Sequence, residues 1–190
     1  AKAVGAPEAF VLDPSGEQTS RKVKGFLSEI GTALRVIETN TQWANRAELY
    51  IGLLKESVRR DLRESHCPLV FWDYCVERRV RINNLTAGSL FQLQARTPHE
   101  TIYHEEGDIS NLSTYGWYQW VYYRDFAQFP QDKMKLGRTL GPANGEGNEM
   151  SHWILNHNGN VVSRRSHRPL TPDELASETE KSKRKAFDAK

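Results

Sequence analysis

The stretch Gln42-Trp43-Ala44-Asn45-Arg46-Ala47-Glu48 opens a long regular pattern around which the rest of the chain is organised. Beyond it, apolar side chains recur every three or four residues, which predicts a helix over residues 45–65 with one face on a core. The apolar positions are Ala47, Ile51, Leu54, Val58 and Leu62. Glu48 falls at the border between that stripe and solvent, where the helix dipole favours a first-turn carboxylate. It is therefore either a candidate metal ligand or an ordinary helix-start acid.

The composition is that of a globular chain. Its 190 residues, 38% of them hydrophobic and 26% charged, suffice for one good core or two small ones. No apolar run reaches the roughly eighteen residues of a membrane span, and no signal peptide is evident, so we expect an intracellular protein of nucleus or cytoplasm. Cys67 and Cys75 lack the spacing of a zinc site and are predicted to be reduced. A net charge of +2 permits a nucleic-acid partner without indicating one.

The N-terminal part predicts alternating strands and helices. Residues 10–12 form a short apolar run typical of a buried strand, and Asp13 follows it directly, before a turn. Either Thr19 or Ser20 can cap the next helix, and residues 34–37 predict a second strand. Ligands of open α/β sheets bind where strands end. We therefore expect Asp13 to lie opposite the acid of the long helix.

The C-terminal part changes pattern. Residues 68–93 predict another helix, residues 94–111 a polar linker, and residues 112–170 a small antiparallel β module. Within that module, Asn158-Gly159 predicts a hairpin with a type I′ turn. Residues 171–190 are rich in Ser, Glu and Lys and predict either disorder or a solvated helix. The expected strands cover residues 115–124, 135–140, 152–155 and 161–165.

From about residue 9 to 170, an ordered series of motifs resembles retroviral-type integrases, specifically those of copia-type long-terminal-repeat retrotransposons. Asp13 and Glu48 stand at an interval close to that of the family's catalytic pair. Further matching motifs follow in order: Pro68-Leu69-Val70-Phe71-Trp72, Ile82-Asn83-Asn84, Thr97-Pro98-His99-Glu100, Ile109-Ser110-Asn111-Leu112, Tyr115-Gly116-Trp117, Leu136-Gly137-Arg138 and Val161-Val162-Ser163-Arg164. One such motif would be weak, but the ordered series is specific.

The resemblance implies an α/β fold in which residues 1–93 form a partial ribonuclease-H-like core and residues 112–170 an SH3-like β module. It also implies an ancestral metal-dependent polynucleotidyl transfer, which integrates DNA. In the family, the counterparts of Asp13 and Glu48 bind Mg²⁺ or Mn²⁺ together with an earlier aspartate that has no counterpart here. The chain is therefore expected to be a fragment or a descendant of an integrase, with metal only in a complete site.

The predicted partner is DNA, both retroelement ends and target, with a possible homo-oligomer and no membrane. The predicted DNA-contacting residues are Asn45, Lys55, Arg164, Arg165 and Arg168. An arginine run is also typical of a merely solvated face. The aromatic residues from Tyr115 to Tyr123 divide between two faces of the expected strand, with Tyr115, Trp117 and Tyr123 on one face and Tyr118, Trp120 and Tyr122 on the other. One of the two sets is predicted to be core, and the exposed set could stack on bases.

Two rival functions are open at this point. One is a non-catalytic nucleic-acid-binding or scaffold protein that keeps the fold and has lost the metal site. The other is a protein-interaction module whose aromatic β portion binds peptides. The six histidines are scattered, without the spacing of a zinc site.

Overall fold

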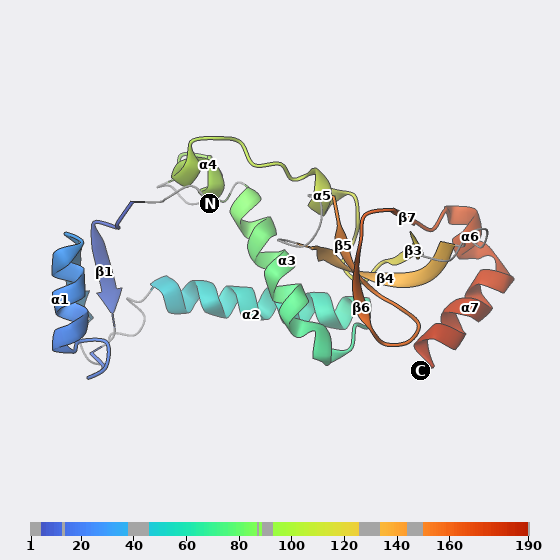
Figure 1. Cartoon of the computed structure of the whole chain (residues 1–190), viewed down its shortest axis with the longest axis horizontal. Helices are drawn as coiled ribbons and strands as arrows, with labels where there is room; N and C mark the ends of the chain where they lie inside the picture. Colours follow the sequence, from blue (N-terminus) through green and yellow to red (C-terminus); the bar gives the residue numbers. More distant parts are fainter. Residues whose placement is uncertain are drawn as a thin grey trace.

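The computed structural model describes residues 5–12, 14–37, 46–86, 88, 93–125, 134–143 and 150–189. Asp13 and Asn45 therefore lie outside the described residues. The molecule is elongated, with a small strand–helix unit at one end, a long helix through the middle and a sheet at the other end (Figure 1).

The N-terminal unit has the predicted order of strand, helix and strand. Strand β1 (Ala9–Leu12) pairs in parallel with β2 (Ala33–Val36), and helix α1 (Arg21–Glu29) connects them. Ser20, one of the two predicted caps, accepts a hydrogen bond from the Val23 backbone N–H at 3.5 Å. Because the strands are parallel, both end at the same edge of this sheet.

Helix α2 (Arg46–Ser65) confirms the predicted long helix, but only its second half lies on a core. Val58 and Leu62 are buried, whereas four apolar residues of the first half are 45–60% exposed: Leu49, Tyr50, Ile51 and Leu53. The prediction that Ala47 and Ile51 pack on a core is therefore wrong for the described residues. The reason lies in the neighbouring helix, which crosses α2 in its second half and then diverges from it (Figure 1).

That neighbour is shorter than the helix predicted over residues 68–93. A turn of 3-10 helix (Leu69–Phe71) leads into α3 (Trp72–Leu85), and Thr86 is already extended. Arg79 of α3 donates to Asp61 of α2, its Nε lying 2.8 Å from Oδ2, which fixes the crossing of the two helices. Cys75 of α3 is fully buried at this crossing.

The expected linker over residues 94–111 contains helical turns. Thr97 and Glu100 form a reciprocal capping box that starts α4 (Pro98–Tyr103), and α5 (Ser110–Ser113) follows. The capping box satisfies two backbone donors at the helix start, which stabilises a helix too short to show a periodic pattern.

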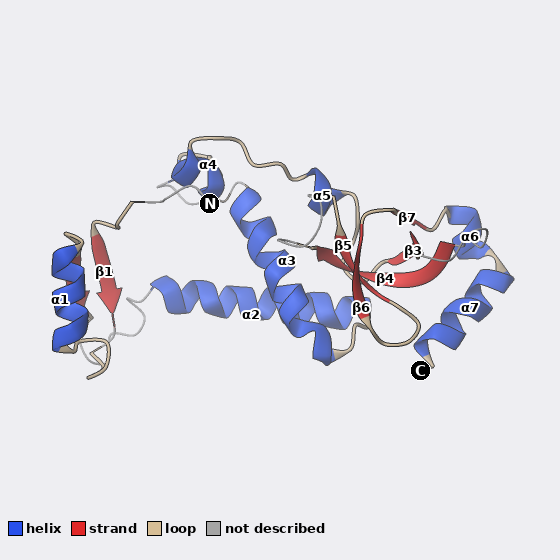
Figure 2. Ribbon diagram, viewed as in Figure 1, coloured by secondary structure: helices blue, strands red, loops and turns tan. Residues whose placement is uncertain are grey.

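The predicted β module is a five-stranded antiparallel sheet with the order β6-β5-β4-β3-β7 (Figure 2). The strands are β3 (Trp120–Arg124), β4 (Met134–Pro142), β5 (His152–Leu155), β6 (Val161–Arg164) and β7 (His167–Pro169). Strand β3 begins later than predicted because Tyr118 has a φ of 56°, which extended backbone cannot accommodate.

The sheet curls on itself. Strands β5 and β7 are separated by β4 and β3, so a flat sheet would hold them about 14 Å apart. Nevertheless, the imidazole of His152 on β5 is hydrogen-bonded to that of His167 on β7, with ring centroids 4.5 Å apart. Val121, Tyr123 and Ile154 are buried inside the curl.

The β5–β6 hairpin is confirmed, but its type I′ turn is not. Of the two predicted central residues of this turn, Asn158 and Gly159, only Gly159 has a positive φ, of 80°, whereas a type I′ turn needs a positive φ at both. Instead, the Asn156 side chain accepts from the backbone N–H groups of Asn158 and Asn160 at 2.9 and 3.0 Å. These two local hydrogen bonds stabilise the turn.

A second core joins the sheet to the two long helices. It contains Leu140 and Leu155 from the sheet, Val58 and Leu62 from α2, and Cys75 from α3. Both cysteines are free and buried, and burial raises the pKa of the Cys75 thiol to about 11. The predicted reduced thiols are thus inert members of this core.

The C-terminal segment is helical, so of the two predicted alternatives the disordered tail is wrong and the helix is confirmed. Helix α6 (Pro172–Ala176) begins with a second capping box, and α7 (Glu178–Asp188) follows. Phe187 of α7 contacts the Trp120 ring edge-on at 5.2 Å, so the segment lies against β3. Within the described ranges, none of the helices is both long and apolar enough to cross a membrane.

Candidate functional site

Glu48 lies where the sequence predicts it, exposed on the first turn of α2. This end of α2 is the one nearer to β1 and α1 (Figure 1). Asp13 follows Leu12, the last residue of β1, at the sheet edge shared with Val36. Because Asp13 itself is outside the described residues, its proximity to Glu48 stays a prediction.

The described residues do not complete a metal site. Among them, no three His, Cys, Asp or Glu side chains lie close enough together to hold an ion. Glu48 alone offers a carboxylate of the hard-oxygen type that Mg²⁺ and Mn²⁺ prefer. Metal binding by Asp13 and Glu48 therefore also stays a prediction.

Lys55 lies on the same face of α2 as Glu48. Seven residues correspond to nearly two full turns, so the two side chains project in one direction about 10 Å apart along the axis. Both are exposed. On this face, Glu48 offers a carboxylate that can hold a metal ion, and Lys55 offers a cation that can contact a phosphate.

The three predicted arginines do not form one face. Arg164 is in register with His152, on the inside of the curl, and donates to Asp125 at 3.0 Å. Arg168 is in register with Tyr122, on the outside, because Tyr122 alternates with the buried Val121 and Tyr123. Arg165 is exposed beyond the end of β6. Alternation along the strands thus places Arg164 and Arg168 on opposite sides of the sheet, and DNA contact by the three arginines stays a prediction.

A different constellation lies on the outside of β3. Trp120 and Tyr122 both point outward there, Arg138 of β4 is in register with Trp120, and Arg168 with Tyr122. We call these four residues the aromatic–arginine face. The Arg138 guanidinium carbon lies 3.5 Å from the Trp120 ring centroid, and that of Arg168 lies 5.2 Å from the Tyr122 ring. Stacked guanidinium groups of this kind are favourable cation–π contacts.

Arg138 has unused hydrogen-bonding capacity. Its Nη1 donates to the Tyr118 carbonyl at 3.1 Å, while its buried Nε has no acceptor in the part of the chain that the structure describes. Burial lowers the pKa of Arg138, although a guanidinium stays charged at any physiological pH. The sequence shows Arg138 only within the Leu136-Gly137-Arg138 motif, because its place beside Trp120 depends on strand register.

The C-terminal helices cover this face. Asp188 accepts from Arg138 Nη2 with both carboxylate oxygens at 3.2 Å, and Glu174 accepts from Arg168 at 2.7 and 2.8 Å. Glu180 accepts from the Tyr122 hydroxyl at 2.5 Å. The Arg168 hydrogen bonds, followed by the Thr171 backbone N–H, hold the pKa of Glu174 at about 2. Three acids therefore face the sheet.

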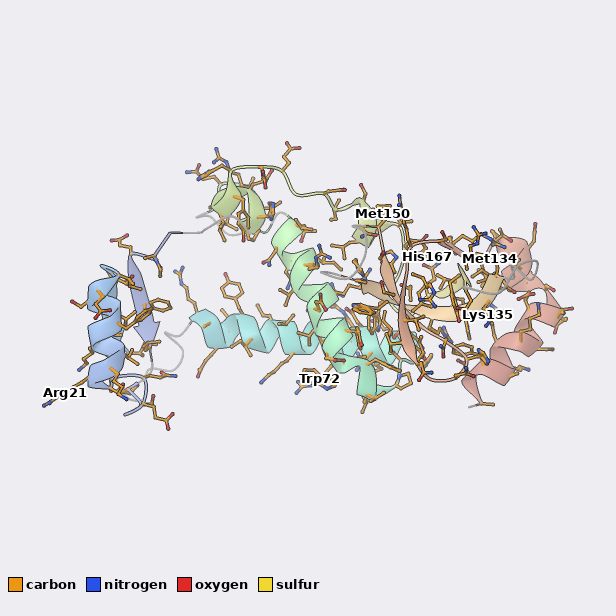
Figure 3. The ribbon with its side chains drawn as sticks, viewed as in Figure 1. Arg21, Trp72, Met134, Lys135, Met150 and His167 are labelled. Atoms are coloured by element: carbon orange, nitrogen blue, oxygen red, sulfur yellow. The ribbon has the colours of Figure 1, made fainter. Side chains whose placement is uncertain are left out.

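A hollow of about 700 Å³ opens beside the Arg138–Asp188 ion pair and is also lined by Phe71, Tyr118 and Phe187. Away from this face, an apolar groove of about 790 Å³ lies between the first half of α2 and the end of α3. Figure 3 shows the side chains crowded around His167 and Lys135 in the sheet, whereas Arg21 on α1 lies at the far end.

These features define a mixed α/β protein with a five-stranded antiparallel sheet. No protein-family model matches the sequence, and the search of the curated proteins gave no match. Among solved structures, the chain is similar to one in the cryo-EM structure of the simian T-cell lymphotropic virus intasome in complex with PP2A regulatory subunit B56 gamma. The identity is 14% and the TM-score 0.41, over 89% of this chain and 60% of that one. The chain thus spans less than two thirds of that structure's length, and a similarity of this size assigns no function.

Proposed function

We propose that this chain is an integrase-related, nucleic-acid-binding protein in which Asp13 and Glu48 supply two ligands to a divalent metal ion. The observation that carries the proposal is the exposed position of Glu48 on the first turn of α2. In the sequence, α2 follows the parallel strands β1 and β2, and Asp13 comes directly after the last residue of β1. This arrangement agrees with the order of the integrase-like motifs. The observed fold is equally compatible with a protein that binds nucleic acid without catalysis.

In the catalytic form of the proposal, a bound ion would activate a water or a DNA 3′-hydroxyl for attack on phosphorus. Glu48 would hold the ion, and Lys55 would contact a neighbouring phosphate from the same face of α2. Two carboxylates without a third leave a metal under-coordinated. We therefore expect weak metal binding and no DNA joining by this chain on its own.

The test is a titration of the full chain with Mn²⁺, followed by electron paramagnetic resonance of the free ion. Weak binding is expected in the parent and in Glu56→Gln, a control that removes an exposed acid from the same helix. It should be lost in Glu48→Gln and in Asp13→Asn. Equal binding by the parent and Glu48→Gln would remove the metal-site assignment.

A non-catalytic nucleic-acid-binding function is the second candidate, favoured by the aromatic–arginine face. Its test is fluorescence anisotropy of the full chain with labelled DNA at several salt concentrations. Each neutralised phosphate contributes about 0.9 to the log–log salt slope of duplex binding, so a few contacts predict weak, strongly salt-dependent binding. Joint replacement of Arg138 and Arg168, the two arginines of that face, should lower both affinity and slope, and an unchanged slope would count against these arginines as DNA contacts.

A further inference from the structure

The aromatic–arginine face is occupied by the chain itself, through a set of groups that resembles a nucleotide strand in its chemistry. Asp188 and Glu174 are carboxylates held by Arg138 and Arg168, each through two N–H···O bonds. Phe187 places an aromatic ring against Trp120. A single-stranded nucleic acid likewise presents anions that arginines bind, its phosphates, and planar rings that aromatic side chains contact, its bases.

We propose that the aromatic–arginine face binds single-stranded nucleic acid and that α6 and α7 compete for it as an internal acidic cover. The inference rests on the proposed function only in assuming a nucleic-acid partner, and it is independent of the metal site. It assigns the partner's class, the residues that contact it and the segment that regulates access.

The geometry of β3 favours single-stranded nucleic acid over a duplex. Trp120 and Tyr122 are alternate residues on one strand face, so their side chains stand about 6.6 Å apart and can each receive one base of an extended chain. In a duplex, the bases are already stacked on one another and their faces are unavailable to such rings. The hollow of about 700 Å³ beside Arg138 leaves room for a sugar or a further base.

The cover is weakly held. Helix α7 has no buried residue, and helices of its length are marginal in isolation. Asp188 remains 49% exposed in its ion pair, and exposed pairs contribute little to stability. Other charges of α7 pair within the helix, as Lys181 does with Glu178 at 2.6 Å, and do not depend on the sheet. Release of α7 therefore withdraws Phe187 from the margin of the core shared with α2 and α3, but leaves Val121, Tyr123 and Ile154 inside the curl undisturbed.

An acidic peptide could use the two arginines, as α7 does, but it has no succession of planar groups to match the two rings. The cover itself places a single aromatic side chain, Phe187, on the face. A nucleotide strand uses both rings and both arginines together. The experiment includes a glutamate-rich peptide as a separate arm for this reason.

The experiment measures fluorescence anisotropy of a labelled oligothymidylate with the full-length chain at low salt. The double variant Phe187→Ala/Asp188→Asn removes both contacts of the helix end and should bind roughly tenfold more tightly than the parent, because the closed population no longer competes. Tyr122→Phe keeps the ring, loses the bond to Glu180 and should shift affinity in the same direction. Glu178→Gln, which removes one acid from the exposed side of α7, should stay within about twofold.

A second pair of variants tests the ring contact in the opened chain. Trp120→Leu should weaken single-strand binding by roughly 5- to 100-fold, since each stacked base contributes strongly to affinity. Trp72→Leu, at an exposed tryptophan on α3, should leave it unchanged. Circular dichroism identifies any variant that fails to fold, and Tyr122→Leu then replaces Trp120→Leu.

Three outcomes overturn the inference. The first is an opened chain that binds the oligothymidylate no more tightly than the parent, and the second is an equal gain in affinity for a duplex of the same length. The third is oligothymidylate binding that the glutamate-rich peptide displaces but that Trp120→Leu leaves unchanged. Absence of DNA binding by the parent and every variant at low salt would remove the proposed function as well. DNA binding by the parent that does not tighten for the single strand in the opened chain would remove this inference alone.

Discussion

The two ends of the molecule differ in what covers their apolar side chains. At the N-terminal end, Phe26 of α1 and Leu49 of α2 are about 60% exposed, whereas Val121, Leu140 and Ile154 of the sheet are essentially inaccessible. Both regions have regular apolar patterns in sequence. The difference shows that a periodic stripe becomes a core only where a second layer faces it. The stability of the described fold therefore resides in the sheet, α3 and the second half of α2.

The largest predicted effect compares one substitution at the two ends. Leu140→Ala, in the shared core, should lower the free energy of unfolding by about 2–5 kcal/mol, since it removes buried contacts and leaves a cavity. Leu49→Ala, on the exposed half of α2, should change it by less than about 0.5 kcal/mol. Urea unfolding followed by tryptophan fluorescence measures both. Similar losses from the two variants would mean that the first half of α2 is covered in solution.

The second prediction concerns acid. Burial, followed by the adjacent His167, lowers the pKa of His152 to about 4 from an ordinary 6.5. Between these values the unfolded chain takes up a proton that the folded chain refuses. The contribution of His152 to the free energy of unfolding is therefore fully present above about pH 6.5. It falls by about 3 kcal/mol in total as the pH drops towards 4.

Unfolding free energies from pH 7 down to the acid limit of the folded state test this linkage. His152→Gln retains a donor for the Asn111 carbonyl and should flatten the profile. An unchanged profile in this variant would assign the acid sensitivity to other groups.

The third prediction compares two glycines. A Cβ on Gly137 would lie 2.8 Å from the Leu155 carbonyl oxygen and 2.7 Å from Ile154, so Gly137→Ala should destabilise the sheet by roughly 1–3 kcal/mol. Gly52 in α2 has open space around its Cβ position, and Gly52→Ala should stabilise by about 1 kcal/mol because alanine is the better helix former. Thermal unfolding of both variants provides the measurement. A neutral Gly137→Ala would mean that β4 and β5 can separate without loss.

Local signals predicted most elements of the fold. The apolar period predicted α2, and the β-branched and aromatic runs predicted β5 and β6. The capping boxes that start α4 and α6 are also visible in the sequence, as Thr97 to Glu100 and Thr171 to Glu174. The helices that they start are too short to show a periodic pattern, so the capping residues are the only local signal for them.

The features that the sequence could not predict depend on neighbours in space. Whether Ile51 is buried depends on where α3 crosses α2, which no local pattern specifies. The place of Arg138 beside Trp120 depends on strand register, because a shift of one residue would move Arg138 to the other side of the sheet. Arg168 was predicted as a phosphate contact, but its pairing with Glu174 depends on α6 lying over the sheet. The sequence thus predicts individual candidate residues, but it does not predict which of them lie together in the fold.

The smallest predicted effect concerns the edge of the stable region, where α7 meets the sheet. Asp188→Asn removes a half-exposed ion pair and should lower global stability by only about 0.5 kcal/mol or less. Local opening should respond more clearly, since α7 can leave the sheet without disturbing Val121 or Ile154. Amide hydrogen exchange of α7 should accelerate severalfold in this variant, while exchange in β3 and β4 stays unchanged. Equal acceleration in α7 and β3 would show that the cover and the sheet unfold as one unit, and the contrast between a firm sheet and a releasable helix would then be wrong.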